Sequence, residues 1–210
     1  MDIKWLGQSS FEIKTDGLVI YIDPYYGEYN DKADVILVSH FHYDHCSLEI
    51  IKKIRKDDTT IIGTPEVASQ MDGCRAVRAG EQGIIGKMEV TITQAYNTRN
   101  IGKEKHSKED TIGFLIQAEG KRIYYSSDTD FIPEMKDIKA DIVIVPVGGT
   151  NTMDAKEAAS AVKLIKPKTA IPIHYGKTAG TMDDALYFKE LLENEQINVI
   201  ILKEEEWQKI

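Results

Sequence analysis

The run His40-Phe41-His42-Tyr43-Asp44-His45 decides how this chain is interpreted. It directly follows Val35-Ile36-Leu37-Val38, and a continuous apolar stretch of this kind is typical of a strand covered on both faces. Imidazole and carboxylate are the ligands that a borderline divalent ion such as zinc prefers, and burying each without a partner would be costly. The cluster therefore predicts a metal site at the end of a buried strand. A solvated polar loop is the alternative for any single histidine.

The spacing within the run leaves room for two ions. His40 and His42 are two residues apart in an extended segment, so their side chains project to the same side. Asp44 and His45 lie just beyond, where the chain turns towards the next helix, and can serve a second ion nearby. A spacing of about 3.5–4 Å between two ions is usual for hydrolytic dinuclear sites.

Two further ligand candidates stand where other predicted strands end. Asp128 lies in Ser126-Ser127-Asp128-Thr129-Asp130, and His174 lies in Ile171-Pro172-Ile173-His174-Tyr175-Gly176. Ligand sites in α/β sheets gather at the carboxyl ends of strands, so both side chains can converge with the first cluster. A lone histidine in this position would otherwise be an ordinary core or surface residue.

The rest of the chain alternates between strand and helix patterns. Predicted strands are 3–6, 11–14, 18–22, 35–38, 60–63, 88–94, 111–118, 122–126, 142–145, 170–173 and 197–202, and predicted helices are 48–54, 66–71, 155–165 and 183–194. Strands on both sides of helices indicate an α/β layered fold. A length of 210 residues without a Pro/Gly/Ser linker fits one domain over residues 1–210.

Composition limits the classes of function. The net charge of −8 argues against a nucleic-acid partner, because such a surface repels phosphate backbones. Two cysteines, Cys46 and Cys74, form no disulfide-rich pattern, and no apolar run is long enough to span a bilayer. The first residues lack the apolar core of a signal peptide. We therefore expect a cytoplasmic protein with reduced thiols and no membrane partner.

Together these segments resemble the metallo-β-lactamase superfamily. The resemblance rests on the HxHxDH run, the strand-end aspartate in its SDTD context and the PIHYG segment, and it extends over nearly the whole chain. It is closest to the small branch related to ascorbate-6-phosphate lactonase. The resemblance implies an α/β fold arranged as a four-layer αβ/βα sandwich, with the metals at one edge. It also implies zinc or manganese, one or two ions per chain.

The resemblance further implies a division of the ligands. His40 and His42 would hold the first ion, Asp44, His45 and His174 the second, and Asp128 would bridge both. Diiron flavoproteins of the superfamily carry a carboxylate where this chain has His42, which favours hydrolysis over oxygen reduction. Asp44 would also be catalytic, orienting a metal-activated hydroxide and passing its proton to the leaving group.

One position departs from the family pattern. The family usually supplies a third histidine for the first ion from the end of the strand that here reads Thr91 to Asn97. This chain offers Asn97 there, a weaker donor that is a candidate ligand or substrate contact. His106, in the polar loop Asn100 to Asp110, is a candidate replacement ligand or substrate contact, and a surface-loop histidine is the equal alternative. Ser127, where the family often has glycine, is a milder change.

The expected function is hydrolysis of a small ester, lactone or phosphodiester, with a small molecule as the partner. The alternative is a metal-binding protein with reduced or lost catalysis, which Asn97 suggests. Three other features remain to be interpreted. Asp23 either supports a ligating histidine or forms an Asp-Pro turn. Tyr25, Tyr26 and Tyr29 pack together, line a pocket or form a dimer contact, which leaves a homo-oligomer open. The tail at 203–206 is expected to be a solvated end.

Overall fold

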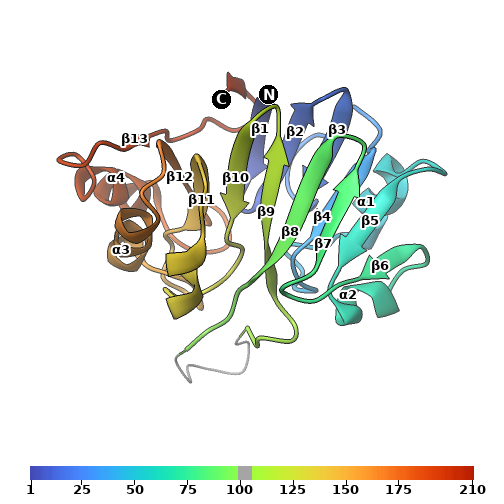
Figure 1. Cartoon of the computed structure of the whole chain (residues 1–210), viewed down its shortest axis with the longest axis horizontal. Helices are drawn as coiled ribbons and strands as arrows, with labels where there is room; N and C mark the ends of the chain where they lie inside the picture. Colours follow the sequence, from blue (N-terminus) through green and yellow to red (C-terminus); the bar gives the residue numbers. More distant parts are fainter. Residues whose placement is uncertain (99–105) are drawn as a thin grey trace.

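Two mixed seven-stranded sheets stack face to face and carry helices on their outer faces, as Figure 1 shows for the computed structural model, which describes residues 1–98 and 106–210. The first sheet has the order β14-β1-β2-β3-β4-β5-β6 and the second has the order β13-β12-β11-β10-β9-β8-β7. The strands of the first sheet are β1 Asp2–Gly7, β2 Ser10–Thr15, β3 Leu18–Ile22, β4 Val35–Val38, β5 Thr60–Gly63, β6 Cys74–Ala76 and β14 Trp207–Lys209. Those of the second are β7 Gln82–Ile85, β8 Met88–Gln94, β9 Ile112–Ala118, β10 Lys121–Tyr125, β11 Ile142–Pro146, β12 Thr169–Ile173 and β13 Asn198–Val199.

Strand β4 shows why the sheets are layered in this way. All four of its residues are buried, and they divide between two cores according to the two-residue period of a strand. Val35 and Leu37 join the core between the two sheets, whereas Ile36 and Val38 join the core between the first sheet and its helices. The continuous apolar run of β4 therefore corresponds to a strand covered on both faces, as the sequence predicts.

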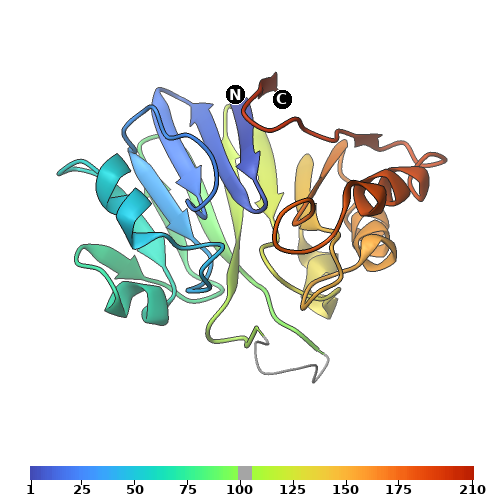
Figure 2. The same ribbon diagram turned by 180° about the vertical axis from the view of Figure 1, so that it is seen from behind.

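The helices cover the outer faces of the sandwich. Helix α1 (Leu48–Ile54) and helix α2 (Pro65–Ser69) flank the first sheet, and helix α3 (Ala155–Ile165) and helix α4 (Met182–Glu190) flank the second (Figures 1 and 2). A short 3-10 helix, η1, spans Pro133–Asp137. The resulting order of helix, sheet, sheet and helix confirms the predicted αβ/βα four-layer sandwich. In the described part of the chain, no helix is long and apolar enough to cross a membrane.

Strand direction brings the predicted site together. β3 and β4 run parallel, as do β10, β11 and β12, so the residues that follow β3 and β4 share an edge, as do those that follow β10 and β12. β8 and β10 both pair antiparallel with β9, so the end of β8 reaches the same edge of the second sheet. The two termini lie side by side at another edge, where β14 pairs with β1 (Figures 1 and 2).

Several predicted elements differ from the observed ones. The last helix ends at Glu190 rather than at residue 194, and the strand predicted over 197–202 pairs as a strand only at Asn198–Val199. The strands β6, β7 and β14 and helix η1 were not predicted. Residues 203–206 are exposed, as expected for a solvated tail, and Glu205 N also donates to Trp5 O shortly before β14 begins. These short segments depend on distant partners that local patterns do not reveal.

Candidate metal centre

Seven of the predicted side chains gather at one edge of the sandwich. Three sets of potential ligand atoms lie within 4.8 Å of one another in each set: His40, His42 and His106; His40, His45 and Asp128; Asp44, His45 and His174. The sets overlap, so the seven residues form one continuous centre. Asp128 Oδ2 lies at its middle, 3.3 Å from His45 Nε2, 3.1 Å from His174 Nε2 and 3.6 Å from His106 Nε2.

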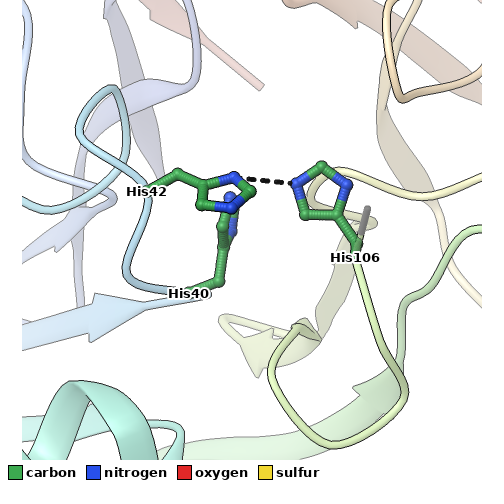
Figure 3. A group of neighbouring side chains, drawn as sticks. All are labelled: His40, His42 and His106. Carbon is green, nitrogen blue, oxygen red and sulfur yellow. Dashed lines mark hydrogen bonds between the residues drawn. The ribbon is translucent and has the colours of Figure 1, made fainter. Parts of the chain in front are cut away.

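His106 turns into this centre rather than out to solvent. It is 4% exposed, and its Nε2 lies 3.1 Å from His42 Nδ1, as Figure 3 shows together with the neighbouring His40. The alternative of a surface-loop histidine is therefore wrong for the position of this side chain. Residues 100–105 of the expected polar loop lie outside the described residues.

Asn97 has a different place from the one the sequence suggested. Its amide oxygen accepts hydrogen bonds from His106 N at 2.8 Å and from His106 Nδ1 at 3.0 Å. Its amide nitrogen donates to Asp130 Oδ1 at 3.0 Å and to Asn151 O at 2.8 Å. Both ends of the amide thus have partners among the described residues, with His106 on the oxygen side and Asp130 and Asn151 on the nitrogen side.

Asp23 supports the histidines of the HxHxDH run from behind. Its carboxylate accepts hydrogen bonds from His45 Nδ1 at 2.8 Å, from Ser39 N at 2.7 Å, from Ser39 Oγ at 2.6 Å and from the hydroxyl of Tyr125 at 2.5 Å. Because Ser39 Oγ donates to Asp23, it accepts from His40 Nδ1, which is 3.0 Å away. One fully buried carboxylate thereby places Nδ1–H protons on two histidines and leaves both Nε2 atoms free to bind a cation.

Two site residues adopt a left-handed backbone. Ser127 has φ 59° and His174 has φ 60°, a region that favours glycine and that costs other residues of order 1–3 kcal/mol. This conformation explains why a glycine would suit position 127. Around His174 the chain is packed closely: a Cβ atom on Gly180 would lie 2.7 Å from Gly148 Cα and 2.8 Å from His174 O. The two glycines therefore allow the loops on either side of His174 to approach.

The centre is strongly polarised. Burial disfavours the charged form of His45, yet the carboxylates of Asp128 and Asp23 outweigh it and hold the pKa of His45 well above its ordinary value. Burial raises the pKa of Asp128, but the neighbouring His174 and His45 outweigh this effect and hold that pKa well below its usual range. Burial lowers the pKa of His40 and of His106, which keeps these two imidazoles neutral. The two neutral imidazoles and the ionised carboxylate are donors for a cation, whereas a charged His45 must release its second proton before its Nε2 can bind one.

The unpartnered atoms at this edge test whether divalent ions fit. His40 Nε2, His45 Nε2 and Asp128 Oδ1 are buried and have no hydrogen-bond partner among the described residues. Each such atom costs about 1–3 kcal/mol unless something binds it. The 3.1 Å between His42 Nδ1 and His106 Nε2 is close to the ~3.3 Å expected for two nitrogens bound 2.0–2.1 Å from one tetrahedral ion. The residues present therefore fit divalent metal ions.

A hollow of about 170 Å³ opens onto the centre. Five residues of the centre line it, together with Tyr43, Thr150, Asn151, Thr178 and Ala179; the five are His42, Asp44, His106, Asp128 and His174. Its volume is below the ~300–1,000 Å³ typical of sites for drug-sized ligands, which favours a small reacting group. A larger hollow of about 250 Å³ lies between β5–β6 and β7–β8, away from this centre.

Sequence reasoning missed several supporting residues. Ser39 and Tyr125 hold Asp23, Asp130 holds Asn97, and Asn151 supplies a backbone carbonyl to His106. Ser39 and Asp130 adjoin predicted ligands, so proximity could have marked them. The partner of Tyr125 comes from the other sheet, and no local pattern could have revealed it.

Two stacked sheets between helix layers, with a histidine- and aspartate-rich centre at one edge, define a protein of the metallo-β-lactamase fold. The model of the β-lactamase superfamily domain matches residues 2–174. The chain belongs to this superfamily and, within it, to the UPF0173 family of metal-dependent hydrolases.

Relatives of this family match the chain over nearly its whole length. A UPF0173 metal-dependent hydrolase of Methanopyrus kandleri is 32% identical over 96% of this chain and 96% of its own. A UPF0173 protein of Pyrococcus abyssi is 34% identical over 96% of this chain and 95% of its own. The crystal structure of a candidate metal-dependent hydrolase from Parabacteroides distasonis superimposes with a TM-score of 0.87 and 31% identity, covering 97% of this chain and 93% of that one.

Proposed function

We propose that this chain hydrolyses a small ester, lactone or phosphodiester at a centre that holds two zinc or manganese ions. One observation carries the proposal: seven histidine and aspartate side chains converge where buried nitrogen and oxygen atoms lack partners, and five of the seven residues line a small hollow. His40, His42 and His106 would hold one ion and Asp44, His45 and His174 the other, with Asp128 between them. The family name of the relatives supports this assignment.

The ions, when bound, would polarise the carbonyl or phosphoryl group and lower the pKa of water to about 7. The chain's own residues do the remaining work. Asp44 is 6% exposed, lines the hollow and has Oδ2 3.7 Å from His174 Nε2, so its carboxylate can orient an attacking water and accept its proton. The same carboxyl group can then deliver the proton to the leaving group. The small hollow restricts which reacting groups reach Asp44.

The substrate class follows from the same hollow. Tyr43, Thr150, Asn151 and Thr178 offer hydroxyl, amide and aromatic groups on its walls, which suit a small polar molecule. A lactone or ester is therefore the first substrate to try, in line with the resemblance to the lactonase branch. We propose a cytoplasmic protein that acts on such a small molecule, either as a monomer or as a homo-oligomer.

The test is a hydrolysis screen with Asp44→Ala. Zinc- or manganese-loaded protein is assayed on p-nitrophenyl butyrate, dihydrocoumarin and bis(p-nitrophenyl) phosphate, beside Asp183→Ala as a control on the exposed start of α4. We expect hydrolysis of at least one substrate, a loss of at least about a hundredfold in Asp44→Ala, and wild-type rates in the control. Retained hydrolysis in Asp44→Ala would refute its role.

The second candidate is a metal-binding protein with reduced or lost catalysis. That reading rested on Asn97, and His106 now stands beside His40 and His42 where a third ligand was missing. We therefore favour the hydrolase. Metal binding without turnover on any of the three substrates would restore the alternative.

A further inference from the structure

Asn97 joins His106 to the turn that carries Asp128. Besides its side-chain contacts, Asn97 N donates to His106 O at 2.9 Å, so the two residues share three hydrogen bonds. On its other side, the amide nitrogen of Asn97 donates to Asp130, two residues beyond Asp128. Asp130 is also fixed, because its Oδ2 accepts from Thr98 N at 2.8 Å and from Thr98 Oγ1 at 2.9 Å.

The same contacts determine which nitrogen of His106 carries the proton. Two atoms face His106 Nδ1: Asn97 Oδ1 at 3.0 Å and the carbonyl oxygen of Asn151 at 3.1 Å. Both are acceptors, so Nδ1 must be the protonated nitrogen. The lone pair is then on Nε2, which points to His42 and Asp128.

The orientation of the Asn97 amide is equally constrained. Its nitrogen faces a carboxylate oxygen and a backbone carbonyl, both acceptors, and its oxygen faces the backbone N–H of His106, a donor. A flipped amide would oppose like groups at all three contacts. The amide is therefore held in one orientation by Asp130, by the carbonyl oxygen of Asn151 and by the backbone of His106.

We propose that Asn97 is the positioning residue of the first ion: it selects the Nδ1–H form of His106 and fixes Nε2 beside His40 and His42. The inference rests on the proposed function and goes beyond it, because it gives a role to a residue outside the ligand set. It also explains why a strand-end asparagine accompanies a histidine nine residues later. In place of a ligating histidine at the end of the strand, Asn97 holds His106 as the third ligand.

Two variants separate this role from a simple packing role. Asn97→Ala removes the amide, whereas Asn97→Leu removes its hydrogen bonds and keeps a branched side chain with the same number of heavy atoms. Asn198→Ala, at an exposed position in β13, is the matched control. Metal-free proteins are titrated with zinc against a chromophoric chelator, and the histidine forms are read from long-range ¹H–¹⁵N spectra of the metal-free state.

We expect both Asn97 variants to bind one ion as the wild type does and the other about 10–100-fold more weakly, with the control unchanged. In the metal-free spectra, part of the His106 population should shift from the Nδ1–H to the Nε2–H form in both variants, because only the Asn151 carbonyl among the described acceptors still faces Nδ1. Wild-type affinity for both ions together with a retained Nδ1–H signal would overturn the inference. Equal weakening of both ions together with a lower melting temperature of the metal-free variants would also overturn it, in favour of a general structural role.

Failure of the proposed function would look different. If the wild type binds no divalent ion, the metal centre itself is refuted. The metal-free spectra still decide whether Asn97 sets the form of His106, because that readout needs no ion. The two failures are thus distinguishable in one set of samples.

Discussion

Replacing Tyr125 by phenylalanine should destabilise the protein by an amount that its contacts set. The hydroxyl of Tyr125 is fully buried and donates to Asp23 Oδ2 at 2.5 Å. Hydrogen bonds to charged groups contribute about 1.5–3 kcal/mol, and the ring itself stays in place, so no large cavity opens. Because Asp23 keeps three other hydrogen bonds, we expect a loss of about 2 kcal/mol in the free energy of unfolding, or roughly 4–8 °C for a chain of this length.

The assay is urea unfolding in excess chelator, which removes any contribution from bound ions. Tyr175→Phe is the matched control, because Tyr175 is equally buried and its hydroxyl has no hydrogen-bond partner in the described part of the chain. Removing that hydroxyl should change the free energy of unfolding by no more than about 0.5 kcal/mol, or stabilise the protein. Equal losses in the two variants would refute the reasoning, since burial rather than the contact with Asp23 would then set the cost.

Three further predictions concern the ions, the thiols and the response to acid. Removing divalent ions should lower the melting temperature, and zinc should restore it. Each ion at a hundred times its dissociation constant adds about 2.7 kcal/mol to the free energy of unfolding. Identical melting curves with and without ions would contradict a metal centre. Burial raises the pKa of the Cys46 thiol to about 12 and that of Cys74 to about 11. Alkylation near pH 8, monitored by peptide mass spectrometry, should therefore be slow at both thiols and rise about tenfold per pH unit. Rapid modification of Cys46 would show that its thiol is not buried. Although burial opposes it, the backbone N–H of Arg122 and the ammonium of Lys168 lower the pKa of Asp141, so its contribution to stability is complete above the ordinary value of 3.8 and is lost as the pH falls below it. Asp141→Asn should therefore lower the urea midpoint at pH 7, and the gap to the wild type should close below about pH 4; a gap independent of pH would argue against ionisation as its source.

The layered fold could be predicted because its signals are local. The buried run at 35–38 and the helical spacing over 155–165 specify a doubly covered strand and an amphipathic helix, and both occur with the predicted bounds. The short edge strands at 82–85 and 207–209 carry no such signal. Their pairing depends on partners far away in the chain, since β14 pairs with β1 at the opposite end of the sequence.

The candidate site also has one part that local sequence patterns predict and another part that they do not. The HxHxDH run is contiguous, and Asp128 and His174 end strands that parallel pairing brings to one edge, so their convergence follows from strand order. The position of His106 could not be decided from the sequence, because a polar loop can place a histidine inside or outside. Three hydrogen bonds to Asn97 hold His106 in its orientation, and no local sequence pattern predicts these bonds.

The partners of Asn97 show what the sequence could not supply. An asparagine at the place of an expected histidine suggests a missing ligand, and the sequence alone offers no other partner for its amide. In the fold, the amide meets Asp130, Asn151 and His106 at once. A residue that looked like a defect in the metal site instead lies where it can support a ligand.

The most direct test of the account is the metal content of the protein purified without chelators. Mass spectrometry of the wild type and of His106→Ala gives the identity and number of ions per chain, and Lys108→Ala, at an exposed position two residues away, controls for changes in this segment. We expect two zinc or manganese ions in the wild type and the control, falling towards one in His106→Ala. No bound ion, or a content unchanged by His106→Ala, would contradict a dinuclear centre completed by His106.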